Sequence, residues 1–286
     1  MFSCFACGGG STMGYKLAGY DVLGCNEIDP RMIEIYKKNH NPKYAFCEPI
    51  QEFKNKEDLP EELFNLDILD GSPPCSTFSM AGNRDKDWGK EKKFREGQAK
   101  QVLDTLFFDF IDLAKKLQPK VVIAENVKGL LLGDAIRYVQ KIYEAFDNAG
   151  YYCQHFLLDA QYMGVPSMRE RVFFICLRKD LAAPFLQVAN LFDEKPFIDL
   201  TFNEKTILFE EIADYKGNKL TAFQEKYWHL KKDGDKSPAD VIFRETGKLS
   251  CFNLQYIFKH KVHPTLCSKG MQNSLLWDKP IYASLT

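Results

Sequence analysis

The sequence lacks any apolar run that approaches the roughly 20 residues needed to span a bilayer. Its first residues, MFSCFACGGG, also lack the basic region and apolar core of a secretory signal peptide. The formal net charge is only −1, with 27% charged residues, so a polyanion would have to bind through a local basic patch. We therefore expect a cytoplasmic protein that makes no contact with a membrane.

A disulfide framework is not indicated either. The nine cysteines are odd in number and scattered through apolar segments, which suits reduced thiols. Cys4 and Cys7 have C-x-x-C spacing, but no second pair stands at metal-ligand spacing, so zinc or redox chemistry is the less favoured interpretation and no metal is expected. Ligand spacing is also missing among the histidines, and we expect a structural role for His40, His155, His229, His260 and His263.

Short apolar runs alternate with longer amphipathic ones along the first two thirds of the chain. We expect strands at residues 1–5, 21–25, 66–71, 121–126, 151–160 and 171–178, with a weaker one near 45–50. Helices are expected at residues 11–18, 30–39, 101–117 and 134–149. This alternation predicts an α/β fold with a doubly wound, mostly parallel sheet. Because the pattern dissolves after about residue 179, we place a domain boundary there, with a smaller second domain over 180–286.

A glycine-rich turn joins the first expected strand to the first expected helix. Without side chains, such a turn lets a nucleotide-like ligand approach the backbone. Glu27 ends the second expected strand about twenty residues further on, where an acid accepts hydrogen bonds from ribose hydroxyls in nucleotide-binding sheets. The two features together predict a nucleotide-binding site.

The stretch GSPPCSTFS places Cys75 on a rigid turn behind two prolines, which fix φ and lack an N–H. The turn alone favours a reactive role only weakly, and a buried structural cysteine is the alternative. Glu125 ends the neighbouring strong strand, so both side chains can face one pocket at the carboxyl edge of the sheet. Arg169 and Arg171 lie two residues apart at the start of a strand, where alternation points them to the same side. Such a pair suits an anion or a carboxylate, and an exposed basic strand end is the alternative.

The segment from residue 79 to 97 is polar and unusually long for a loop inside a compact domain. Long loops in such a position are often lids or binding loops, and a solvated loop is the plain alternative. Its basic side chains are Arg84, Lys86, Lys90, Lys92, Lys93 and Arg95.

Taken together, the motifs resemble those of the DNA cytosine-C5 methyltransferases of bacterial or phage restriction–modification systems, in order and in spacing. The resemblance rests on FACGGG, NEID, GSPPCSTFS, DTLFFDF, PKVVIAENV and GVPSMRERVFFI, and it covers roughly residues 1–178. It implies a Rossmann-like adenosylmethionine-binding catalytic domain over residues 1–179 and a target-recognition domain over 180–286. It also implies double-stranded DNA as the partner and the bacterial cytosol or nucleoid as the location.

The resemblance further implies methylation of cytosine carbon 5, with S-adenosyl-L-methionine as cofactor and S-adenosyl-L-homocysteine as product. Cys75 matches the nucleophile that adds to ring carbon 6 of a base flipped out of the duplex. Glu125 matches the residue that hydrogen-bonds or protonates ring nitrogen 3, Arg171 matches the arginine at the cytosine carbonyl oxygen, and Arg169 resembles its companion. The cofactor positions fall on Phe5, Gly8, Gly10, Glu27, Ile28, Pro74 and Leu106. Residues 79–97 match the mobile catalytic loop, whose lysines would meet phosphates.

The sequence departs from the family pattern at several points. Cys7 occupies a glycine position of the cofactor turn, Pro49 stands where an aspartate usually contacts adenine, and Ser167 replaces a common glutamine. The C-terminal motifs of the family are not found, so we expect a truncated form, a degenerate gene product, or half of a split enzyme whose second chain supplies them. Two alternatives therefore remain open: a non-catalytic subunit that binds DNA or a partner chain, and an RNA cytosine-C5 methyltransferase. The Cys-Phe-Thr motif of the tRNA-acting relatives is absent, which disfavours the RNA alternative.

Overall fold

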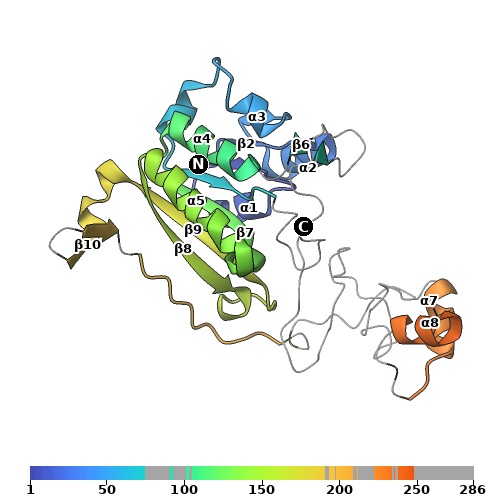
Figure 1. Cartoon of the computed structure of the whole chain (residues 1–286). Helices are drawn as coiled ribbons and strands as arrows, with labels where there is room; N and C mark the ends of the chain where they lie inside the picture. The colour runs from blue at the N-terminus through green and yellow to red at the C-terminus, as the bar shows by residue number, and fades with distance from the viewer. Residues whose placement is uncertain are drawn as a thin grey trace. The chain divides into compact units, whose positions relative to one another are not determined.

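The structure is a computed structural model of the 286-residue chain (Figure 1). It describes residues 1–74, 91–92, 101–102, 105–190, 193–196, 198–208, 211, 222–233, 235 and 238–247. The chain divides into two compact units, Met1–Leu158 with Arg171–Leu200, and Asp159–Glu170 with Thr201–Thr286. The first unit thus continues to Leu200, whereas the sequence placed the domain boundary at residue 179. The assignment of catalysis and target recognition to separate domains stays a prediction.

A seven-stranded sheet forms the centre of the fold, in the order β3-β2-β1-β4-β7-β9-β8. The pairs β1–β2, β2–β3, β1–β4 and β4–β7 are parallel, and β9 returns antiparallel to β7. The predicted Rossmann-like, mostly parallel sheet is therefore confirmed. Its strands are β1 (Phe2–Cys4), β2 (Gly24–Asn26), β3 (Tyr44–Phe46), β4 (Ile68–Gly71), β7 (Val121–Val127), β8 (Tyr151–Asp159) and β9 (Glu170–Arg178).

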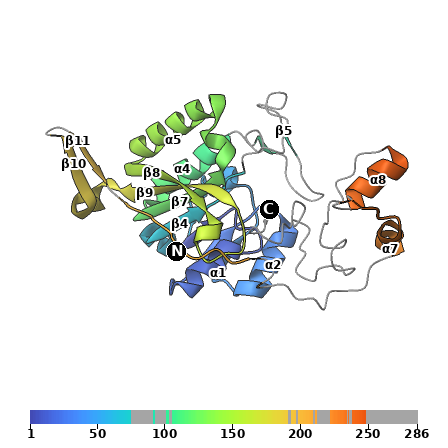
Figure 2. The same ribbon diagram turned by 90° about the horizontal axis from the view of Figure 1, so that it is seen from below.

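Helices cover both faces of this sheet. Figure 2 shows α1 (Gly10–Leu17) and α2 (Pro30–His40) on one face and α4 (Leu106–Leu117) and α5 (Ile136–Asn148) on the other. Proline at the first position of α2 has no N–H to leave unpaired, and the side chain of Asp29 caps that end by accepting from the Arg31 N–H at 2.8 Å. The arrangement confirms the doubly wound α/β fold.

The helix expected at residues 101–117 begins later, at Leu106. Residues Gln101–Val102 form β6, which pairs antiparallel with β5 (Glu91–Lys92). The periodicity that placed Val102 on the helix was therefore wrong, because Val102 instead pairs in a strand with Glu91, eleven residues earlier.

Shorter elements complete the described structure. Several single 3₁₀ turns link the main elements: η1 (Glu61–Asn65), η3 (Lys128–Leu131), η4 (Gly133–Ala135), η5 (Ala160–Tyr162), η6 (Lys179–Leu181) and η7 (Ala183–Phe185). The remaining elements are α3 (Ile50–Phe53), the antiparallel pair β10 (Leu186–Asn190) and β11 (Asp193–Pro196), α7 (Ala222–His229) and α8 (Pro238–Thr246). Among the described helices, none combines the length and the apolarity that crossing a membrane would take.

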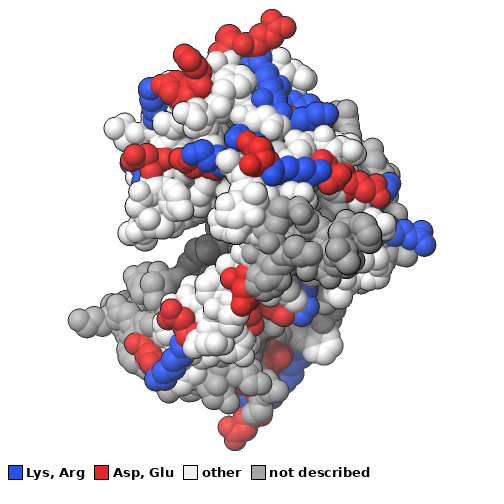
Figure 3. Space-filling model, turned by 90° about the vertical axis from the view of Figure 1, so that its left-hand side faces the viewer, with Lys and Arg blue, Asp and Glu red and all other residues white. Residues whose placement is uncertain are grey.

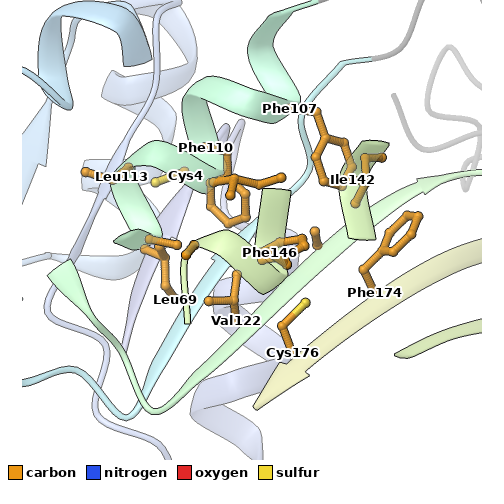
Figure 4. Close-up of a cluster of buried hydrophobic side chains, with 14 of the residues drawn as sticks. Cys4, Leu69, Phe107, Phe110, Leu113, Val122, Ile142, Phe146, Phe174 and Cys176 are labelled. Carbon is orange, nitrogen blue, oxygen red and sulfur yellow. The ribbon is translucent and has the colours of Figure 1, made fainter. Parts of the chain in front are cut away.

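The main core lies between the sheet and the α4–α5 layer (Figure 4). Leu69 and Val122 are register partners on β4 and β7, and both are fully buried beneath the two helices. Each such side chain contributes about 1.5–3 kcal/mol when it is removed from water. The core therefore fixes β4 beside β7. Its other labelled members are Cys4, Phe107, Phe110, Leu113, Ile142, Phe146, Phe174 and Cys176.

Gly71 ends β4 at a point where α4 comes very close to the sheet. A Cβ placed on Gly71 would lie 2.6 Å from Cε2 of Phe110, and Phe110 is completely buried. The glycine is thus required by the approach of an aromatic ring.

Candidate active site

Four chain segments with predicted site residues meet at one edge of the sheet. The strands β2, β1, β4 and β7 are parallel neighbours, so their carboxyl ends point the same way. The glycine turn, defined here as residues 5–10, follows β1, and Glu27 follows β2. The proline turn, defined as residues 72–74, follows β4, and Glu125 lies near the end of β7. The topology thus brings these segments to the edge where ligands of doubly wound sheets bind, and their expected role as one site stays a prediction.

The glycine turn is built around three residues with left-handed backbone conformations. Phe5 has φ 53°, Cys7 has φ 49° and Gly9 has φ 90°. Cys7 thus adopts a conformation that glycine reaches at no steric cost. Its N–H donates to Oε2 of Glu27 at 2.7 Å, which helps to offset the strain of the left-handed conformation.

Glu27 is only 8% exposed and is oriented by the backbone. Besides the bond from Cys7, its Oε1 accepts from the Asp29 N–H at 2.9 Å. A carboxylate offers about four lone-pair positions, so Glu27 can accept further hydrogen bonds after these two. The expected role of Glu27 toward ribose hydroxyls stays a prediction.

The carboxyl end of α2 supports the glycine turn from below. The side-chain amide of Asn39 donates to the Gly8 carbonyl at 3.1 Å, and a Cβ on Gly9 would lie 2.1 Å from Nε2 of His40. His40 is 6% exposed, and its burial lowers the pKa of the imidazole. We expected a structural role for His40 from the sequence, and its imidazole ring packs directly against Gly9 of the turn.

The outer side of the same turn is open. A Cβ on Gly10 would meet no described heavy atom within 4 Å, and one on Gly8 would come only within 3.5 Å of Ile35. The other predicted cofactor residues vary in exposure: Phe5, Ile28 and Pro74 are half-buried, whereas Leu106 is completely buried in the main core.

Asn126 ties the proline turn to β7. Its Nδ2 donates to the Pro73 carbonyl at 3.2 Å, and its Oδ1 accepts from the Val127 N–H at 2.8 Å. Asn126 is 3% exposed, so both bonds are shielded from water. Cys75 lies outside the described residues, directly after Pro74. The predicted position of its thiol therefore stays a prediction.

Glu125 and Arg171 form an ion pair at this edge, with Nε of Arg171 2.9 Å from Oε1 of Glu125. The antiparallel register sets Val127 opposite Arg171, which places the two charged side chains on one face of the sheet. Burial lowers the pKa of Arg171, and the carboxylate of Glu125 opposes that effect. The side chain of Glu125 is 25% exposed and that of Arg171 is 21% exposed, so a ligand can still contact the pair.

Arg169 belongs to the other compact unit, where its carbonyl accepts from the Ala160 N–H at 3.1 Å. Its expected partnership with Arg171 stays a prediction. The catalytic loop expected at residues 79–97 lies outside the described residues except for Glu91 and Lys92. On the face shown in Figure 3, acidic and basic side chains of the described residues are intermingled.

The C-x-x-C pair is split between two environments, since Cys4 is buried in the core and Cys7 is exposed. Within the described ranges, no three His, Cys, Asp or Glu side chains gather as a metal-binding group. Sequence reasoning missed Asn126 and Asp70. A charged residue inside the otherwise apolar strand LDILDG was the available signal for Asp70.

Comparison with known proteins agrees with this architecture. The sequence model of C-5 cytosine-specific DNA methylases matches residues 1–240. The type II methyltransferase M.FnuDI of Fusobacterium nucleatum is 33% identical over 258 residues, which cover 90% of this chain and 65% of that protein. M.NgoPII of Neisseria gonorrhoeae is 36% identical over 186 residues, which cover 65% of this chain and 50% of that protein. The chain thus spans between half and two thirds of the length of these relatives.

A solved structure supports the fold. A triple mutant of DNMT2 from Spodoptera frugiperda matches with a TM-score of 0.52 at 20% identity, covering 80% of this chain and 63% of that one. The family match spans the glycine turn, Glu27, the proline turn and the Glu125–Arg171 pair. The chain belongs to the C-5 cytosine-specific DNA methylase family.

Proposed function

We propose that this chain transfers a methyl group from S-adenosyl-L-methionine to carbon 5 of cytosine in double-stranded DNA. The observation that carries the proposal is the Glu125–Arg171 ion pair, which lies at the sheet edge where Asn126 binds the proline turn. A carboxyl group and a guanidinium placed together can pair with ring nitrogen 3 and the adjacent carbonyl oxygen of a cytosine. The relatives M.FnuDI and M.NgoPII are named type II methyltransferases, which supports the same activity.

Cys75 is the proposed nucleophile. Its thiolate adds to carbon 6 of the ring and forms a carbon–sulfur bond, while Glu125 hydrogen-bonds or protonates nitrogen 3 to offset the developing charge. Arg171 holds the carbonyl oxygen, and Arg169 assists it. The electron pair gained by the ring makes carbon 5 the nucleophile toward the methyl group. Loss of the carbon-5 proton to a base then expels the Cys75 thiolate and leaves 5-methylcytosine.

S-adenosyl-L-methionine supplies the methyl group as an electrophile and leaves as S-adenosyl-L-homocysteine. The chain's own residues fit this molecule, because Glu27 retains acceptor capacity for ribose hydroxyls and the outer side of the glycine turn is open at Gly10. Glu27 would bind the ribose. The backbone of the turn would face the methionine part. The remaining proposed contacts are Phe5, Gly8, Ile28, Pro74 and Leu106.

Double-stranded DNA is the proposed substrate, in the bacterial cytosol or nucleoid. Cytosine carbon 5 is hidden within the duplex, so the base must be flipped out to reach Cys75. Residues 79–97 would close on the DNA with their lysines against phosphates, and residues 180–286 would supply target recognition. A second chain is a further proposed partner.

The test uses the chain as it exists, incubated with labelled adenosylmethionine and duplex DNA containing 5-fluorocytosine. Fluorine cannot leave as a proton does, so the protein should remain bonded to the DNA and survive denaturing electrophoresis. Cys75→Ser should abolish this adduct. The matched control Cys47→Ser changes an exposed cysteine and should leave the adduct unchanged.

An adduct that persists in Cys75→Ser, or its absence from the wild-type chain with and without a supplied partner, would contradict the proposal. An adduct formed with 5-fluorocytosine RNA but not with DNA would transfer the activity to RNA.

A further inference from the structure

Asp70 is a charged residue inside a buried central strand. Its side chain is 6% exposed, and Ile68, Leu69 and Gly71, the other residues of β4, are also buried. A carboxylate is strongly disfavoured in such surroundings unless hydrogen bonds replace its lost hydration. The proposed reaction assigns no role to this group.

Three hydroxyl groups enclose the Asp70 carboxylate. Its Oδ2 accepts from Oγ of Ser3 at 2.9 Å and from Oγ of Ser11 at 2.8 Å, and its Oδ1 accepts from the hydroxyl of Tyr15 at 3.2 Å. We refer to these four side chains as the Asp70 cage. Burial raises the pKa of Asp70, and the three hydroxyls act in the opposite direction.

The cage joins the two turns of the candidate site. Ser3 lies in β1 just before the glycine turn, and Ser11 and Tyr15 lie in α1 just after it. Asp70 itself comes two residues before the proline turn. Each of the three hydrogen bonds therefore links the strand that leads to Cys75 with a segment that borders the glycine turn.

The cage also faces the same side of the sheet as the ion pair. Asp70 is the register partner of Ser3 on β1 and of Ile123 on β7, two residues before Glu125. Residues two apart on a strand share a face. Repulsion from Glu125 makes a small contribution to the raised pKa of Asp70, in keeping with this shared face.

We propose that Asp70 is a positioning residue, which holds the glycine turn and the proline turn at a fixed separation so that the cofactor and Cys75 meet in the correct geometry. The consequence for the cofactor rests on the proposed function. The link between the two turns does not rest on the proposed function, and its effect on the opening of the turns can be measured without any ligand.

The test compares two variants of the cage with a matched control. Asp70→Asn keeps the size of the side chain and removes its charge, and Ser11→Ala removes one hydrogen bond. The control Asp67→Asn changes an acid three residues earlier in the chain, which is 64% exposed and pairs with Lys120 at 2.7 Å. Hydrogen exchange, followed by mass spectrometry of peptides over residues 5–12 and 68–74, measures the opening of the two turns.

In Asp70→Asn, exchange in both peptides should accelerate by about tenfold relative to the rest of the chain, because hydrogen bonds to a charged group are lost. Ser11→Ala should show a smaller change, and Asp67→Asn should match the wild type. Calorimetry should show adenosylmethionine bound about tenfold more weakly by Asp70→Asn. A general loss of stability would instead reduce the fraction of folded protein without changing the affinity of that fraction for adenosylmethionine.

If the cage only stabilises the fold, Asp70→Asn would lower the melting temperature but leave the relative exchange at the two turns and the cofactor affinity unchanged. That result would overturn the proposal. If Asp70→Asn does not fold, Ser11→Ala decides by the same two measurements. If the wild-type chain binds no adenosylmethionine, the proposed function fails, and exchange at the two turns still decides the role of Asp70.

Discussion

Replacing Gly71 by alanine tests how tightly α4 holds the strand that leads to the proline turn. The added Cβ would lie 2.6 Å from Cε2 and 2.9 Å from Cζ of Phe110. Carbon atoms in contact prefer about 3.5 Å, so the ring would have to retreat by about 0.9 Å (3.5 − 2.6). Phe110 is completely buried and lies 6.4 Å from the ring of Phe5, so little space is open to it.

We expect Gly71→Ala to lower the free energy of unfolding by about 1–3 kcal/mol, the usual cost of overpacking a core. At about 2–4 °C per kcal/mol for a domain of this size, that corresponds to a melting temperature lower by roughly 2–12 °C, measurable by circular dichroism. Gly14→Ala is the matched control, because a Cβ there meets no described heavy atom within 4 Å and α1 gains a better helix former. That control should stabilise the chain by about 0.5–1 kcal/mol.

A double-mutant cycle isolates the contact. Phe110→Leu shortens the side chain, so Gly71→Ala should cost less in that background than in the wild type. If Gly71→Ala unfolds like the wild type, or if the two changes are additive, the close approach of Phe110 does not explain the glycine.

Three further results are expected. Glu125→Gln removes the charge beside Arg171, so the rate of covalent adduct formation with 5-fluorocytosine DNA should fall by about 100-fold or more, with little change in melting temperature. An unchanged rate would exclude Glu125 from the chemistry. The aspartate of Asn126→Asp cannot donate to the Pro73 carbonyl when it is ionised. Urea denaturation should therefore show a free energy of unfolding lower by at least about 1–2 kcal/mol, and the adduct should form more slowly. Wild-type values for both would contradict the role of Asn126 in holding the proline turn. Burial lowers the pKa of His40, so below pH 6.5 the unfolded chain binds more protons than the folded chain, and the free energy of unfolding should decrease as the pH falls from there. Urea denaturation between pH 5 and 8 should show a smaller decrease in His40→Gln than in the wild type. An equal decrease in the two proteins would contradict this role of His40.

The sheet could be predicted because its strands are short apolar runs bounded by turn residues. LDILDG contains β4 and VVIAEN contains most of β7, and both lie where the alternation of strands and helices placed them. Pro30 marked the start of α2 for a local reason, since proline suits the first helical position. Signals of this kind act over a few residues, so the sequence alone reveals them.

Features that depend on distant segments could not be predicted in the same way. The pairing of Arg171 with Glu125 depends on the antiparallel register of β9. From the sequence, the alternation of side chains along a strand only grouped Arg171 with Arg169. The role of Asp70 likewise depends on hydroxyls 55 to 67 residues away. The nucleophilic role of Cys75 rests on motif order, and it stays a prediction.

The reversed direction of β9 determines which part of that strand holds Arg171 in place. A strand that runs against its neighbours brings its first residues, and not its last, to the edge where the parallel strands end. Arg171 is therefore anchored by the later residues of its own strand, since Val172, Phe174 and Cys176 are all completely buried and a slip of one residue would turn them outward. Residues 160–168 can then change in length or composition without moving the guanidinium of Arg171, because its position is fixed by the buried residues that follow it in β9.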